Sequence, residues 1–155
     1  MTRLAGNMNA EMVLVAAADA FNGNPSSTFV DASGYSALAF LVLIDGTTGT
    51  TTGRATIVVQ EADDAAGTGA AAIAAEALNP EGKALDSGVL TAITTSGFSP
   101  AANAENLVLI EVDPRALSKR YVGLSFTEDV NDPVTAGAVA IGLGSRYKGD
   151  TVTAL

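Results

Sequence analysis

Hydrophobic residues alternate with polar or small ones through the second half of the chain, and this period of two predicts β-strands. Strands are expected over residues 106–113, 119–127 and 136–144, each with one hydrophobic face. One such face in each strand is assigned to the core of a folded domain. The residues assigned to that core are Val108, Ile110, Val112, Val122, Leu124, Phe126, Val139, Ile141 and Leu143.

Further strands are predicted upstream, over residues 36–44, 54–62 and 88–94, with turns rich in Gly, Pro, Asn and Asp between them. Residues 70–78 have helical propensity but no strong N-cap, so at most one short helix is expected there. Many short strands separated by such turns favour an all-β fold, an antiparallel sandwich or barrel, over a parallel α/β sheet.

The N-terminal 28 residues lack sustained periodicity. Residues 10–21 fit either a short helix or an early strand, and a breaker run, Asn22–Ser27, follows. The sequence therefore predicts an irregular N-terminal arm over 1–28, laid over a neighbour in an assembly, and a β-sandwich domain over 29–155. Glu11 interrupts the apolar run near the start, which argues against a cleaved signal peptide.

The strand at 136–144 has an unusual second face, made of Ala138, Ala140, Gly142 and Gly144. This face offers no charge to water and no bulk to fill a core. Small residues let another backbone or sheet approach closely. They are the candidate subunit-contact face; the alternative is that a second sheet of the same domain covers them.

Composition excludes several chemistries. The chain has no His and no Cys, so imidazole-based triads, thiolate nucleophiles and Cys/His metal sites are excluded. A formal charge of −9 disfavours contact with nucleic acid or anionic membranes, and the longest apolar run is too short to span a bilayer. We expect no enzyme activity, no cofactor and no resident metal.

Two acidic clusters supply oxygen ligands of the kind that hard cations prefer, but neither has the spacing of a calcium loop. Solvated turns, in which Asp and Asn bond their own backbone, are the alternative. The clusters are Glu61, Asp63 and Asp64, and then Glu128, Asp129, Asn131 and Asp132.

Four short phrases together resemble small virion proteins encoded among the head genes of tailed bacteriophages. They are an S-G-Y entry into a hydrophobic strand, an E-A-D-D-x-x-G turn after a strand, a K-R-Y-V-x-L strand start and a small-residue strand near the C-terminus. They lie at Ser33–Tyr35, Glu61–Gly67, Lys119–Leu124 and Ala136–Arg146. The match spans about residues 29–147 as a pattern of short phrases shared by several phage structural classes.

This resemblance implies a jelly-roll or tulip-like sandwich and the role of a head decoration (cement) protein, usually a trimer. Its partner would be the major capsid protein, and its place the capsid exterior after synthesis in the host cytoplasm. Two alternatives are a head-completion or tail-associated protein and a carbohydrate-binding jelly-roll module. The sugar alternative is weakened by the absence of Trp and by only three Tyr, namely Tyr35, Tyr121 and Tyr147.

Overall fold

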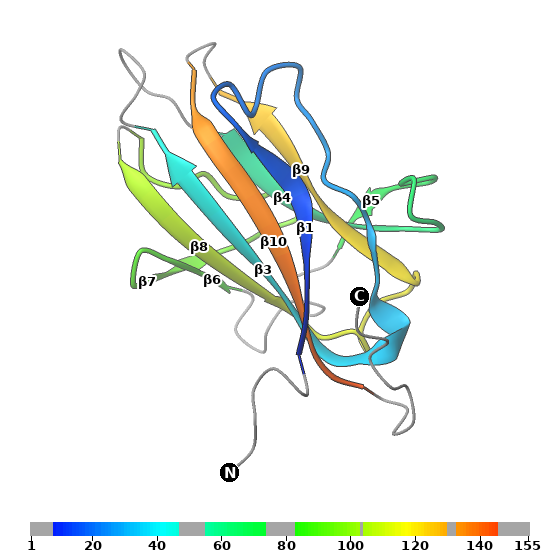
Figure 1. Cartoon of the computed structure of the whole chain (residues 1–155). Helices are drawn as coiled ribbons and strands as arrows, with labels where there is room; N and C mark the ends of the chain where they lie inside the picture. Colours follow the sequence, from blue (N-terminus) through cyan, green and yellow to red (C-terminus); the bar gives the residue numbers. More distant parts are fainter. Residues whose placement is uncertain (1–7, 47–54, 74–82, 103, 130–132, 146–155) are drawn as a thin grey trace.

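Two antiparallel sheets form the structure, a computed structural model that describes residues 8–46, 55–73, 83–102, 104–129 and 133–145 (Figure 1). The first sheet has six strands in the order β1-β10-β3-β8-β6-β7, and the second has four in the order β2-β9-β4-β5. The strands are β1 (Met8–Ala17), β2 (Val30–Asp31), β3 (Tyr35–Asp45), β4 (Ala55–Ala62), β5 (Ala71–Ala72), β6 (Lys83–Asp86), β7 (Val89–Ala92), β8 (Glu105–Val112), β9 (Tyr121–Glu128) and β10 (Thr135–Ser145).

The strand order is that of a jelly roll with an added hairpin. From β1 to β4 the chain changes sheet at each step, and it does so again from β8 to β10. Without the β6–β7 hairpin, each sheet has four strands, the double-sheet arrangement of jelly rolls. Both sheets have free edges, so the predicted all-β sandwich is confirmed and the barrel alternative is not adopted.

The core lies between the sheets and confirms the predicted inner faces of β8 and β9. Val108, Ile110, Val122 and Leu124 have no exposed surface, and Phe126 is 1% exposed. Phe126 stacks on Phe21 with ring centroids 5.2 Å apart. Such aromatic pairs stabilise the folded state by more than their buried apolar area alone accounts for, so these two rings are a central element of the core.

The predicted inner face of β10 is wrong. Val139 and Ile141 are only half-buried and Leu143 is 39% exposed, whereas Ala138 and Ala140 are buried. The reason is volume. Each small residue on the inner face of β10 lies beside a large one on β3, since Ala138 pairs with Val42 and Ala140 with Phe40.

The N-terminal segment is part of the sandwich in the described residues, which corrects the expected boundary at residue 28. β1 pairs with β10 along the sheet edge, and Val13 and Phe21 are buried in the core. The next residues follow β9, where the amide of Phe126 donates to the carbonyl of Pro25 at 3.0 Å. Residues 8–28 therefore bury hydrophobic side chains in the core and form backbone hydrogen bonds to β9 and β10.

The helix expected over 70–78 is replaced, where the structure describes it, by β5. Ala71 and Ala72 pair with Glu61 and Gln60 of β4, while residues 74–78 lie outside the described residues. Within the described residues there is no helix of a length and hydrophobicity that would cross a bilayer.

Candidate contact surface

The small-residue face of β10 is covered by its own chain. Ala138 and Ala140 are 1% and 2% exposed and lie inside the sandwich. Gly142 is also buried, and a Cβ there would overlap the ring of Tyr35. Gly144 is half-buried beside the hydroxyl of Ser36, which donates to the carbonyl of Leu143 at 2.8 Å. Ala138 and Ala140 thus lie in the core between the two sheets, as the alternative expects, whereas Gly142 and Gly144 lie against residues of the neighbouring strand β3.

Tyr35 lies over Gly142, and its side chain is partly buried against the core. Its hydroxyl accepts a hydrogen bond from the Asn9 side chain of β1 at 2.6 Å. A side chain at position 142 would displace the ring and break this bond. The glycine is thus explained by a close intramolecular contact.

The outer face of the six-stranded sheet is unusually apolar. The side chains that leave the core on β3, β8 and β10 include Leu43, Leu107 and Leu143, which are 53%, 50% and 39% exposed. Met12 on β1 is 62% exposed, and Leu90 on β7 is 56% exposed. The solvent-facing side of an antiparallel sheet normally carries polar side chains, whereas this face carries exposed hydrophobic ones. It is therefore the candidate contact surface. The outer face is defined here as the outward side chains of β1, β10, β3, β8, β6 and β7.

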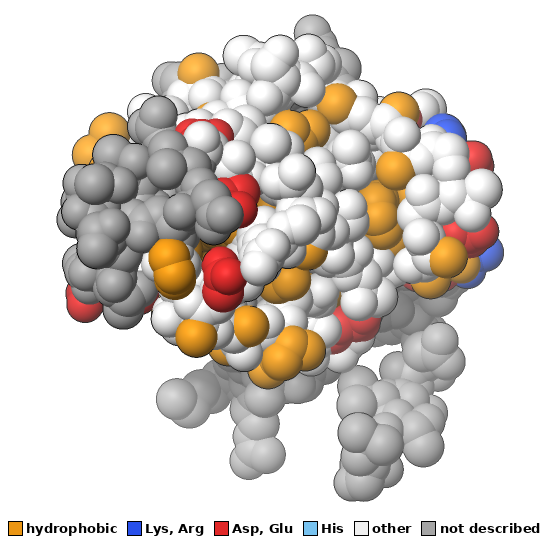
Figure 2. Space-filling view, turned by 90° about the horizontal axis from the view of Figure 1, so that it is seen from above, with side chains coloured by type: hydrophobic (Ala, Val, Ile, Leu, Met, Phe, Trp, Pro, Cys, Tyr) orange, Lys and Arg blue, Asp and Glu red, His pale blue; other side chains and the backbone are white. Residues whose placement is uncertain are grey.

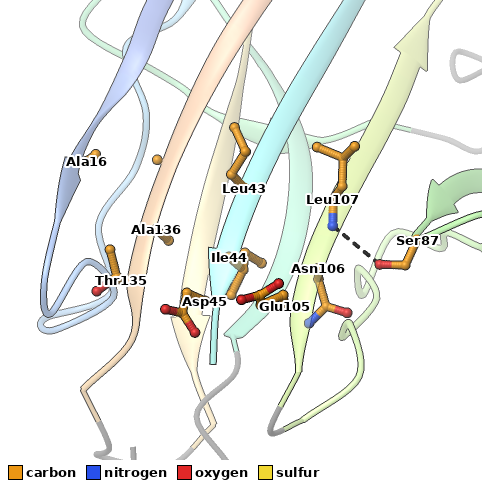
Figure 3. A pocket seen from close by; sticks show the side chains of 11 residues that line it. Ala16, Leu43, Ile44, Asp45, Ser87, Glu105, Asn106, Leu107, Thr135 and Ala136 are labelled. Carbon is orange, nitrogen blue, oxygen red and sulfur yellow. Dashed lines mark hydrogen bonds between the residues drawn. The ribbon is translucent and has the colours of Figure 1, made fainter. Parts of the chain in front are cut away.

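A hollow of about 640 Å³ lies at one end of the outer face (Figure 3). Its floor is apolar, with Leu43 from β3, Leu107 from β8 and the backbone of Gly137 from β10. Glu105 and Asp45 lie at its rim, and the backbone amide of Leu107 donates to Ser87 at 3.3 Å. Its shape and lining suit an apolar side chain of a docked protein better than a charged ligand.

Two of the phrases that carry the resemblance, Glu61–Gly67 and Lys119–Leu124, meet in one polar network at the β4–β5 and β8–β9 connections. Glu61 accepts from the backbone amides of Ser118 and Lys119, at 2.8 and 3.0 Å, and from the Ser118 hydroxyl. Lys119 also contacts Asp63 at 3.1 Å and the Gly69 carbonyl at 2.6 Å. The network ties two connections of the four-stranded sheet together, so these residues stabilise the fold.

Asp31 belongs to the same end of the sandwich. Its carboxylate pairs with Arg120 and accepts from the amide and hydroxyl of Ser33. The hydrogen bond from Arg120 is the main cause that lowers the pKa of Asp31 from 3.8 to about 2. Burial of Glu61 raises the pKa of that carboxyl, but the hydrogen bonds from Ser118 and Lys119 outweigh burial, so the net pKa is lowered.

The first acidic cluster forms a self-bonded turn. Asp64 accepts from the backbone amides of Thr68, at 3.0 Å, and Ala66, at 2.9 Å, and these bonds lower its pKa. Asp63 is paired with Lys119. Among the residues that the structure places, no three His, Cys, Asp or Glu side chains gather to hold a metal ion.

The second acidic cluster is only partly described. Asp129 accepts from the hydroxyl of Thr56 at 2.9 Å, and Glu128 donates its backbone amide to the Asn24 side chain. Asn131 and Asp132 lie outside the described residues.

Charged side chains are unevenly distributed over the surface. Figure 2 shows the visible Lys and Arg side chains at one edge of the view, next to acidic ones, with hydrophobic side chains spread over the rest. Arg115, Lys119 and Arg120 each form an ion pair with an aspartate of this chain. These three cations are therefore already used within the domain.

Comparison with known proteins gives little. No family model matches the chain, and no curated protein matches it. Among solved structures, the chain is similar to the crystal structure of the SPBc2 prophage-derived protein YomS, with a TM-score of 0.46 and 14% sequence identity. The match covers 88% of this chain and 94% of that chain, and it says nothing about the function of this one.

Proposed function

We propose that this chain is a structural protein of a tailed-phage head, a decoration protein that binds the outside of the capsid and stabilises it. The observation that carries the proposal is the apolar outer face, which suits a protein that works through protein–protein contact. The phrases at Ser33–Tyr35, Glu61–Gly67 and Lys119–Leu124 support the phage assignment by resemblance.

The formal charge of −9 supports an external position. Packaged DNA is strongly negative, so a protein with this charge is repelled from the inner surface of a filled head. The trimer implied by the resemblance stays a prediction, and the two-fold contact proposed for the outer face is its rival; sedimentation of the purified chain distinguishes the two.

The test is to count the chain in purified particles by quantitative gel and to add the protein to heads that lack it. A decoration protein covers the shell in many copies, and its addition raises the temperature at which heads break open. A few copies per particle would indicate a head-completion or tail-associated protein instead. Absence from particles, with no binding to heads, would refute a virion role.

A further inference from the structure

One apolar row crosses the whole outer face. Strand register places Met12 beside Val139, Val139 beside Leu41, and Leu41 beside Leu109. Leu109 in turn pairs with Leu85, and Leu85 with Leu90. All six strands of the sheet thus contribute one apolar side chain to a single continuous line.

The rows on either side set the limits of this apolar area. On one side of the apolar row, the next row of paired residues is Ile141, Ala39 and Glu111. On the other side, it is Gly137, Leu43 and Leu107. Beyond the second row, Asp45 pairs with Glu105. The centre is therefore free of charge, and carboxylates stand toward its ends.

The area of the outer face fits a protein dimer. Strands about 4.8 Å apart with a rise of about 3.3 Å per residue give this six-stranded sheet roughly 750 Å² in projection. Side chains make the accessible area larger than the projection, and a standard interface takes about 800 Å² from each partner. The face is thus large enough for a stable contact between two copies.

We propose that the outer face packs against the same face of a second copy of this chain. The two-fold axis runs parallel to the strands, between β3 and β8, and the two sheets stack about 10 Å apart. This axis sets Leu41 against Leu109 of the partner, Val139 against Leu85 of the partner, and Met12 against Leu90 of the partner. Every position of the row then meets an apolar side chain, as a self-complementary interface requires.

The same two-fold axis also determines which residues of the two copies meet outside the central row. Leu107 meets Leu43 of the partner, and the hollow beside Gly137 receives side chains from the partner's sheet. Glu111 meets the small side chain of Ala39 of the partner, while Glu105 meets Asp45 of the partner at the rim. Each copy carries a formal charge of −9, so the two copies repel one another when they associate. Salt screens such exposed charges, so we expect the dimer to strengthen as salt concentration rises.

This inference does not rest on the proposed phage function. It needs only the purified chain, and sedimentation equilibrium over a concentration and salt series measures it. A dimer that tightens with salt is expected. A monomer at all concentrations would overturn it, as would a trimer or a dimer that salt weakens, whereas particle binding tests the phage role separately.

Variants test the face and the axis. Leu107→Glu places a carboxylate in the contact and should raise the dimer dissociation constant at least about 30-fold, the equivalent of losing a hot spot. Val89→Glu makes a similar exchange at a 65% exposed side chain that alternation puts on the opposite side of β7 from Leu90, so it should leave the dimer unchanged. Equal effects of the two variants would overturn the proposal.

Glu105→Gln tests the axis from the opposite direction. It removes one negative charge per copy from the rim of the contact, so it should tighten the dimer and reduce its salt dependence. Circular dichroism melts of all three variants show that each is folded. A dimer that Glu105→Gln weakens would overturn the axis proposed here.

Discussion

Truncation of Phe126 to Ala should lower the free energy of unfolding by about 3–5 kcal/mol, because the ring is fully enclosed. Phe126 is 1% exposed, it lies beside Ile57 of β4 in the sheet register, and its ring stacks on Phe21. The loss combines the transfer free energy of the ring with the cost of the cavity it leaves. Rigid β-strands on both sides limit collapse of that cavity, which places the value toward the upper end.

Urea unfolding followed by circular dichroism measures this loss, with an unchanged m-value as the sign of a two-state comparison. Val89→Ala is the matched control: its side chain is 65% exposed, so it should cost less than about 0.5 kcal/mol. A double-mutant cycle with Phe21→Ala should give a coupling of about 0.5–1.5 kcal/mol for the stacked rings. A loss below about 1 kcal/mol for Phe126→Ala, or additivity with Phe21→Ala, would refute the arrangement of this core.

Three further outcomes follow from the structure. Ala140→Leu should cost about 1–3 kcal/mol by overpacking the interior and leave the oligomeric state unchanged in sedimentation; a folded variant with separated subunits would instead make this strand face a subunit contact. Asp31→Asn should cost about 1 kcal/mol at pH 7, a value discounted because the carboxylate is partly exposed to solvent. The folded-state pKa of Asp31, about 2, lies below the ordinary value of 3.8, so this stabilisation is complete above about pH 4 and is lost as the pH falls toward 2. Urea unfolding curves of both proteins at pH 7 and near pH 2 measure the loss. If Asp31→Asn cost the same at both pH values, the pairing with Arg120 would be contradicted. Gly67→Ala should destabilise by about 1–3 kcal/mol in thermal melts, since Gly67 has a φ of +83° and a Cβ would run into the Phe29 ring, and an unchanged melting temperature would contradict that contact.

The alternation in β8 and β9 predicted their inner faces because their other faces carry polar or small residues: Tyr121, Gly123 and Ser125 in β9. In β8 the outer face also holds leucines, and Glu111 marks it as the solvent side. In β10 both faces are apolar, so period two alone cannot choose between them. The choice depends on the neighbouring strand: β3 already fills the core with Leu38, Phe40 and Val42, and only small residues fit beside them. That information is non-local and is absent from the strand's own pattern.

The N-terminal strand was hidden for a different reason. β1 is an edge strand in which Val13 is the buried residue, and its register shifts between Met12 and Leu14 and again between Leu14 and Ala17. Each irregularity breaks the period of two after a few residues. A strand that is mostly exposed and twice interrupted has little periodicity for a sequence to show.

The sequence did not predict the candidate contact surface, because residues far apart in the chain form it only when their strands pair. Leu43, Leu107 and Leu143 are separate residues in the sequence, and each is unremarkable as a single exposed leucine. The pairing of β3 with β8 and β10 brings them onto one face. Two of the phrases that carry the resemblance lie elsewhere, in the polar network around Glu61 and Lys119 that stabilises the four-stranded sheet.

The packing of β10 links the core to the outer face. Because Ala138 and Ala140 occupy the narrow space beside Val42 and Phe40, the larger Val139 and Ile141 of the same strand must point outward. An apolar outer row is therefore a direct consequence of how the interior is filled. Water contact with that row lowers solubility, while a formal charge of −9 keeps copies from associating indiscriminately. An uncharged centre between acidic ends restricts close approach to orientations that bring the centres together, which favours one defined contact over aggregation.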